Sequence, residues 1–196
     1  SRIRPLRLIP SQFFAQSASW MQIGSMNLTS TLIHQLKSRL RQDASIAVRA
    51  GNAAKDAAQN SVTAMEKRQD SRAMIEQGNM AYAQSKRARL ALEYLQALET
   101  FDERGFTTYH MRSKVGLGAV VDVQCETEDG YIGRTFVMLP VGAGEELTGP
   151  DGDGIITVLT PQSPVGKAMF GKRVGEVAEV TIKREPWEWE ILEVGC

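Results

Sequence analysis

Residues 163–176 read SPVGKAMFGKRVGE, and this stretch decides how the second half of the chain folds. Ser163 followed by Pro164 is typical of a helix start, because a serine hydroxyl caps free amide groups and proline already has a helical φ. Gly166 and Gly171 permit either a close approach between backbone segments or the left-handed residue that ends many helices. The stretch therefore predicts a short helix over residues 165–170.

Strand patterns lie on both sides of this short helix. Gly175 predicts a turn into the β-branched run 177–182. The run 187–191 alternates apolar residues with glutamate, which is typical of a half-exposed strand. Upstream, runs of apolar and β-branched residues predict strands over residues 115–123, 131–139 and 155–159. Residues 142–154 are rich in glycine and acidic residues and predict a loop. We therefore expect a mostly antiparallel sheet over residues 110–196.

The preceding part of the chain has the periodicity of helices. Apolar residues recur at spacings of three and four along one predicted helix face: Leu32, Leu36, Leu40, Ala44 and Ala47. A second predicted face comprises Ala81, Ala88, Leu92, Leu95 and Leu98. Neither face is bulky enough to support a lone helix, so each helix needs the other. We therefore expect an antiparallel helical hairpin, a short coiled coil, over residues 26–102, with its turn between residues 60 and 70.

The charge distribution also separates the two halves. The formal net charge is zero, which gives no global argument for a nucleic acid or an anionic membrane as partner. Residues 26–100 contain eleven Lys/Arg and seven Asp/Glu, whereas residues 101–196 contain nine and sixteen. A mildly basic hairpin thus precedes an acidic β unit, and the complete fold is predicted to be α+β.

Composition favours a cytoplasmic protein. The two cysteines, Cys125 and Cys196, match no zinc or redox spacing, as expected in a reducing compartment. No apolar run approaches the roughly 18 residues of a transmembrane helix, so no membrane partner is expected. Residues 1–25 are expected to form an unstructured leader, because Pro10, Ser11 and Gln12 interrupt the apolar stretch that a signal peptide needs.

The stretch 163–176 resembles the signature of the C-terminal domain of the GreA/GreB transcript-cleavage factors. That signature has Ser-Pro, a hydrophobe, Gly, a basic residue, Ala, two hydrophobes and Gly, followed by a Val-Gly-acidic turn. The segment 136–144 and the final strand 187–194 resemble the same domain, so the likeness covers about residues 110–196. It implies an FKBP-like domain that docks at the rim of the secondary channel of bacterial RNA polymerase while the hairpin enters the channel.

The resemblance also implies what kind of protein this is. A factor of this family is no enzyme itself, and at most it assists the RNA hydrolysis that the polymerase performs. It is expected to act as a monomer and to meet DNA and RNA only through the transcription complex. The factor is expected to hold no cofactor of its own, although Mg²⁺ in the polymerase active centre can be shared.

The hairpin tip is the expected place for that shared Mg²⁺. In the family, acidic tip residues help to hold the ion, and carboxylates suit it because Mg²⁺ prefers oxygen ligands. The matching positions here are Glu66 and Asp70. Lys67 and Arg68 lie between them, and Ala73 occupies a position where the standard factors have glutamate. A solvated turn without metal is therefore the competing interpretation.

Two kinds of role are expected within the signature stretch. Solvent-facing charges on loops are suited to recognition, so Lys172 and Arg173 are the candidate polymerase contacts. The other signature residues are expected mainly to build the domain: Ser163, Pro164, Gly166, Lys167, Gly171 and Gly175.

Three other functions remain open at this point. The protein could occupy the channel as an inhibitor without stimulating cleavage. It could be a peptidyl-prolyl isomerase, since FKBP-like folds include such enzymes, but these need an aromatic pocket for proline. The aromatic residues that the β unit offers for one are Tyr131, Phe136, Phe170, Trp187 and Trp189. Finally, it could be a coiled-coil module that self-associates through the hairpin.

Overall fold

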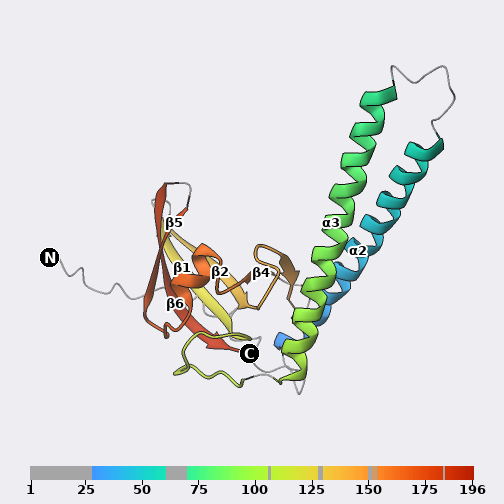
Figure 1. The fold of residues 1–196 in the computed structure, drawn as a ribbon. Coiled ribbons are helices and arrows are strands. Elements are labelled where there is room, and N and C mark those ends of the chain that lie inside the picture. The colour runs from blue at the N-terminus through green and yellow to red at the C-terminus, as the bar shows by residue number, and fades with distance from the viewer. Residues whose placement is uncertain are drawn as a thin grey trace.

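The computed structural model describes residues 28–60, 70–105, 107–127, 130–149, 152, 154–182 and 184–196. Two long helices precede a six-stranded sheet that carries one short helix (Figure 1). The α+β class predicted from the sequence is confirmed. The predicted leader, residues 1–25, lies outside the described residues.

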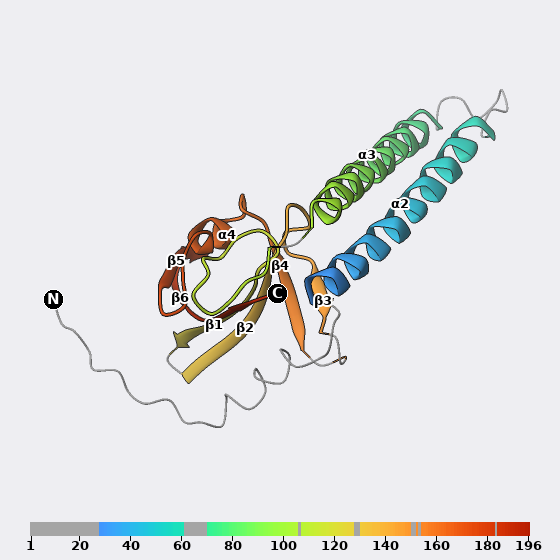
Figure 2. The ribbon, with the colours of Figure 1, turned by 90° about the horizontal axis from the view of Figure 1, so that it is seen from below.

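The helices α2 (Leu28–Asn60) and α3 (Asp70–Glu103) pack against each other as an antiparallel hairpin that projects away from the sheet (Figures 1 and 2). Large residues fill the seam near the sheet, and small residues fill it farther out. The buried seam residues are Leu32, Leu36, Leu40, Ala44, Ala47 and Ala54 on α2, with Ala81, Ala88, Ala91, Leu95 and Leu98 on α3. Because α2 has 33 residues, the arm is about 50 Å long at 1.5 Å per residue.

The prediction that Leu92 belongs to the buried face of α3 is wrong. Leu92 is 59% exposed, whereas its neighbour Ala91 is buried. The buried positions 88, 91, 95 and 98 follow spacings of three, four and three, which keep them on one side of the helix. Leu92 was selected for its apolar side chain, but it lies about 100° away from Ala91 around the helix.

The sheet has the order β3-β4-β2-β1-β6-β5. Its strands are β1 (Val120–Thr127), β2 (Gly130–Met138), β3 (Glu146–Thr148), β4 (Ile155–Leu159), β5 (Val177–Ile182) and β6 (Glu185–Gly195). Four of the five strand pairs are antiparallel, and only β2 and β4 run parallel. The short helix α4 (Pro164–Met169) lies between β4 and β5 in the chain.

Two boundaries differ from the prediction. The strand expected from residue 115 begins only at Val120, although Val115 is buried in the core. Its amide and carbonyl bond to Lys172 O and Gly171 N, both at 2.8 Å, so they pair with the loop after α4 instead of a strand. In addition, β3 lies inside the segment predicted as a loop. Leu147 is 1% exposed and holds β3 against the hairpin base.

The two faces of the sheet have different coverings. One face packs with α4 and the segment 109–119 around the core that contains Trp189, Phe136 and Met169. On the opposite face, the base of the hairpin packs on β2, β3 and β4. This second cluster joins Leu32, Ile33, Leu36 and Leu98 of the helices to Val137, Leu139, Leu147, Ile156 and Val158 of the sheet.

Polar contacts reinforce the junction between hairpin and sheet. The side-chain amide of Gln35 pairs with both backbone groups of Thr148, with distances of 2.9 Å to the oxygen and 3.2 Å to the nitrogen. Arg39 donates to the carbonyl of Glu146. These contacts saturate part of the free edge of β3, which would otherwise expose unpaired backbone groups. The hairpin is thus attached to the sheet by apolar packing and by an edge contact.

Candidate functional site

The helix α4 begins with the serine cap that the sequence predicts. Ser163 has an extended backbone and its Oγ accepts a hydrogen bond from Gly166 N at 3.1 Å. The same hydroxyl donates to Thr160 O at 2.8 Å. Pro164 occupies the first helical turn, where its missing N–H leaves no helical bond unmade. One hydroxyl therefore ties the start of α4 to the end of β4.

Two kinds of glycine shape this region. Gly166 is required by space, since a Cβ there would lie 1.9 Å from the carbonyl oxygen of Thr160. Gly171 and Gly175 are required by conformation, with φ values of 81° and 82° that residues with side chains rarely adopt. Gly171 N bonds to Val115 O and Gly175 N to Ile191 O, both at 2.8 Å. These bonds fix the loop after α4 against two other segments.

The candidate contacts Lys172 and Arg173 lie on this fixed loop. Arg173 is exposed, and Lys172 is half-buried. The backbone nitrogen of Arg173 donates to the carboxylate of Glu176, which closes the turn. Lys167 is exposed on α4. Neither the fold nor the neighbouring side chains therefore prevent these cations from reaching a partner.

The candidate tip residues remain a prediction. Glu66 lies outside the described residues, and so does most of the turn between the two helices. Asp70 is the first residue of α3, but its side chain lies outside the described part of the structure. The nearest described carboxylates on the two arms are Asp56 and Glu76, and both are exposed.

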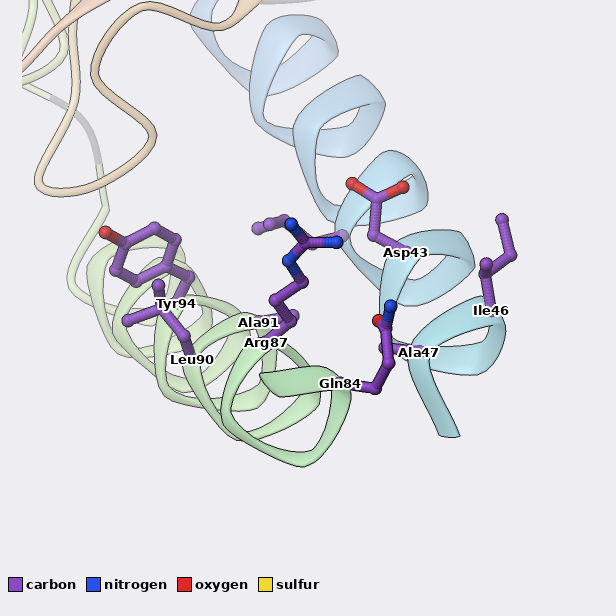
Figure 3. A pocket seen from close by; sticks show the side chains of 9 residues that line it. Asp43, Ile46, Ala47, Gln84, Arg87, Leu90, Ala91 and Tyr94 are labelled. Atoms are coloured by element: carbon purple, nitrogen blue, oxygen red, sulfur yellow. The ribbon is translucent and has the colours of Figure 1, made fainter. Parts of the chain in front are cut away.

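A shallow groove follows one side of the hairpin seam (Figure 3). It has a volume of about 350 Å³ and lies between α2 and α3, with Asp43 and Ile46 on one wall and Arg87, Leu90 and Tyr94 on the other. Ile46 and Leu90 are about half exposed. The groove has a mixed lining and no cluster of groups suited to catalysis, so it is best described as an incompletely filled seam.

An acidic surface that the sequence analysis did not identify lies on the sheet. The strands β1, β5 and β6 place six carboxylates on the hairpin side of the sheet, in the part that the hairpin base leaves uncovered: Asp122, Glu126, Glu179, Glu188, Glu190 and Glu193. Asp122 is opposite Glu193, and Glu179 is opposite Glu188. The alternation of glutamate with apolar residues in β6 was the available signal, but strand pairing was needed to bring the three strands together.

The pair Asp122 and Glu193 carries an electrostatic penalty. Burial raises the pKa of the Asp122 carboxyl, and the hydrogen bond from Thr135 Oγ1 at 2.6 Å lowers it only in part. Burial also raises the pKa of Glu193, and the negative charge of Asp122 adds to this effect. Asp122 and Glu193 therefore bind protons more readily than isolated carboxylates do.

The aromatic residues of the β unit are distributed over several environments. Phe136 is buried and meets the buried Trp189 edge to face, with ring centroids 5.9 Å apart. Trp187 stacks on Trp189 at 5.8 Å. Tyr131 and Phe170 are instead about half exposed. Phe136 and Trp189 are thus used for packing, which gives no support to a proline-binding pocket built from these five rings.

Among the residues that the structure describes, no three His, Cys, Asp or Glu side chains are placed to hold a metal ion. The search for membrane spans over the same residues found no helix with the length and hydropathy to cross a bilayer.

Comparisons with known proteins identify the β unit. Residues 111–195 match the family described as "Transcription elongation factor, GreA/GreB, C-term". The solved structures that are similar include GreA factor homolog 1 (Gfh1) of Thermus thermophilus, with 18% identity over 87% of this chain and 96% of that chain and a TM-score of 0.33. Another is Thermus aquaticus Gfh1, with 17% identity over 86% and 97% of the chains and a TM-score of 0.31. No curated protein matches the chain.

The matched residues are those that the structure assigns to the sheet, α4 and the segment that precedes the sheet. The signature stretch caps α4, keeps Gly166 free of a side chain and turns the chain at Gly171 and Gly175. Residues 111–195 thus form a domain that matches the C-terminal domain of the GreA/GreB transcription elongation factors.

Proposed function

We propose that this chain binds bacterial RNA polymerase, with the β unit docked at the rim of the secondary channel and the hairpin inserted into it. The observation that carries the proposal is the match of residues 111–195 to the GreA/GreB C-terminal domain, combined with an attached helical hairpin. Each arm is about 50 Å long, which suits a probe that reaches from a docking surface to a distant centre.

The hairpin has the properties that insertion requires. Its outer seam is built from alanine and Gly51, and a Cβ added to that glycine would lie 3.8 Å from Gln84 Cβ. Small seam residues allow the two helices to pack closely, so the rod stays narrow. Most exposed positions of the described hairpin are polar, and they are interspersed with large exposed apolar side chains: Ile46, Val48, Ile75, Met80, Tyr82, Leu90 and Leu92.

The base of the hairpin supports a defined direction of insertion. Leu32, Leu36 and Leu98 are fully buried against the sheet or against each other. Lys37 is almost buried and its Nζ lies 2.6 Å from Asp102 Oδ2, which joins the two arms at the base. A force on the outer arms would thus be transmitted to the β unit instead of bending a flexible linker.

The activity at the tip is the finer part of the proposal. Glu66 and Asp70 would share Mg²⁺ with the polymerase and so assist hydrolysis of backtracked RNA. The polymerase itself would perform the reaction, and the chain would act in the cytoplasm as a monomer without a cofactor of its own. If Lys67 and Arg68 neutralise the tip, the same docked chain would only occupy the channel and inhibit.

RNA length in a backtracked polymerase complex tests the proposal. The wild-type chain is expected to shorten the RNA, and Asp70→Ala and Glu66→Ala should abolish shortening while leaving polymerase binding intact. Glu76→Ala is the matched control, because it removes the same charge from an exposed position of α3 farther from the tip.

Three results separate the alternatives. Binding without RNA shortening by the wild type would establish the channel-occupying inhibitor. Equal shortening by all three variants would remove Asp70 and Glu66 from the mechanism. Absence of any polymerase binding would refute the proposed function.

A further inference from the structure

A hollow in the acidic face of the sheet is open to solvent. It has a volume of about 490 Å³, and three of the residues that line it are Glu126, Glu188 and Glu190. The hairpin base packs at the other end of the sheet, toward β3 and β4 (Figures 1 and 2). This part of the hairpin side of the sheet is therefore available to an occupant.

The acidic face carries no compensating positive charge. The residues of β1, β5 and β6 that share this face with Glu188 include no Lys or Arg, and none of their carboxylates forms an ion pair with a residue that the structure describes. Glu190 accepts a hydrogen bond from Gln124 Nε2 at 2.9 Å, but this neutral donor leaves the charge in place. A cationic occupant would therefore gain electrostatic energy on this face.

Two half-exposed side chains complete the hollow. Tyr131 is 54% exposed and lies opposite Glu126, and Val177 is 41% exposed and lies opposite Glu190. A tyrosine ring beside carboxylates can stack on a guanidinium group, and both side chains offer contacts to aliphatic groups. The hollow thus suits a segment that combines arginine with aliphatic residues.

The leader of the same chain has this composition. Residues 1–9 read SRIRPLRLI, in which Arg2, Arg4 and Arg7 are interspersed with isoleucine and leucine. Residues 1–25 contain no Asp or Glu. The hairpin of a second copy is less suitable, because its eleven Lys/Arg in residues 26–100 are mixed with seven Asp/Glu. Charge complementarity therefore favours the leader as the occupant.

The leader is also attached close enough to reach the hollow. Thr29 Oγ1 donates to Gly118 O at 2.7 Å, which fixes the start of α2 beside the start of β1. Gln124, which lines the hollow, is six residues farther along than Gly118, or about 20 Å at about 3.3 Å per residue. A random coil of about 20 residues, the length from Leu8 to Asn27, spans about 25 Å on average. Such a tether gives an effective concentration in the millimolar range, so weak contacts suffice.

We infer that the leader docks in this hollow of its own chain, with Arg2, Arg4 and Arg7 against Glu126, Glu188 and Glu190. The inference goes beyond the proposed function, because the contact needs no polymerase. The docked leader would neutralise part of the acidic face. The charge that this side of the sheet presents to any partner would then depend on residues 1–9.

Paramagnetic broadening in NMR spectra of the full chain tests the inference. A nitroxide attached to Ser1→Cys, with Cys196→Ser to remove the half-buried thiol, should broaden the backbone amide signals of Tyr131, Val177 and Glu188. Cys125 is buried, so the label is not expected there. The amides of α4, which packs on the other face of the sheet, should keep their intensity.

Exchanging the charges shows whether ion pairs hold the leader. Arg4→Glu combined with Arg7→Glu should lower the ratio of docked to free leader about tenfold, because two attractive pairs become repulsive. Glu188→Lys combined with Glu190→Lys should do the same, and all four changes together should restore most of the broadening. Salt at about 0.5 M should weaken the docking of the wild type, because exposed charges are screened.

A matched variant controls for net charge. Asp56→Lys combined with Glu76→Lys changes the net charge by the same amount at exposed positions on the hairpin arms. It should leave the broadening unchanged. If the spectrum of the variant with Glu188→Lys and Glu190→Lys loses its dispersion, Glu188→Gln with Glu190→Gln replaces it and should also reduce docking.

Three results would overturn the inference. Broadening that is absent, or that lies away from the hollow, would mean that the leader does not occupy it. Broadening of isotope-labelled copies without nitroxide, mixed with nitroxide-bearing copies without isotope, would assign the occupant to a second copy. Docking that persists in both charge-reversed variants would exclude the pairing of arginine with glutamate. Polymerase binding enters none of these measurements, so the proposed function stands or fails separately.

Discussion

Replacing Gly166 with alanine tests whether the signature glycine is needed for space. A Cβ at this position would lie 1.9 Å from Thr160 O, 2.7 Å from Ser163 Oγ and 2.8 Å from Thr160 C. The first and third of these are backbone atoms, which cannot move as a flexible side chain would. The φ of Gly166 is not positive, and the residue lies within α4. Helix propensity alone would therefore predict that alanine stabilises the protein by about 1 kcal/mol.

The steric effect should exceed that gain. To accept a methyl group, Thr160 must move by more than an ångström from its place at the end of β4. Ser163 Oγ and N both bond to Thr160 O, at 2.8 and 3.0 Å, and Thr160 N donates to Ser163 Oγ at 3.3 Å. Weakening three hydrogen bonds of about 1 kcal/mol each, or overpacking the site at about 1–3 kcal/mol, costs up to about 3 kcal/mol. After the helix-propensity gain is subtracted, the net loss is about 2 kcal/mol.

Urea unfolding followed by tryptophan fluorescence measures this loss. With a slope of about 2 kcal/mol per molar, the midpoint should fall by about 1 M or more. Ser163→Ala is the comparison variant, because it removes the bonds of the hydroxyl without adding volume, and loss of an N-cap costs about 0.5–2 kcal/mol. Gly175→Ala has open space at its Cβ but a φ of 82°, so it should lose about 1 kcal/mol through backbone strain. A Gly166→Ala protein at least as stable as the wild type would refute the steric argument.

Three further changes have definite expected outcomes. Lys37→Ala should lower the free energy of unfolding by about 1 kcal/mol, a small value because the Asp102 carboxylate left without its partner is 40% exposed. Lys37→Met should lose less, because it keeps the buried aliphatic part of the side chain. An equal loss in both variants would contradict this explanation. Since the folded pKa of Asp122 is raised, its contribution to stability is present at low pH and is lost as the pH rises above about 4 through the raised value. Asp122→Asn should therefore be more stable than the wild type at pH 7 and lose that advantage at pH 3.5 in urea titrations, and an advantage independent of pH would exclude the linkage. In thermal unfolding, Leu92→Ala should change stability by under about 0.5 kcal/mol, whereas Leu95→Ala should lose about 2 kcal/mol or more. Equal losses would mean that Leu92 is buried in the seam between the helices.

Local chemistry made much of the fold predictable from the sequence. The cap at Ser163, the turn at Gly175 and the strands 155–159 and 177–182 depend on neighbouring residues, and the structure contains each of them. The α2 face was also predictable, because leucine and alanine at one spacing leave a single choice of buried side. On α3 the apolar residues are less clearly confined to one face. The sequence therefore predicted that the large Leu92 is buried, whereas the small Ala91 lies in the seam.

The remaining features depend on contacts that are distant in the sequence. β3 forms in a glycine-rich segment because Leu147 finds a place against Leu36 and Val158, and Gln35 pairs with Thr148. No local signal within residues 142–154 contains that information. The acidic face has the same origin, since it joins side chains from strands that meet only after folding. The sequence pointed to Lys172 and Arg173 as polymerase contacts, and that role stays a prediction.

The arrangement of the two surfaces on the sheet has a mechanical consequence. α4 belongs to one face, and the hairpin base is packed on the other through Leu32, Leu36 and Val137. A partner bound on the α4 side would therefore leave the hairpin uncovered. Because both attachments use the same hydrogen-bonded sheet, docking would also fix the direction in which the hairpin points. Loosening the base, for example with Leu36→Ala, should then impair RNA shortening more than it impairs polymerase binding.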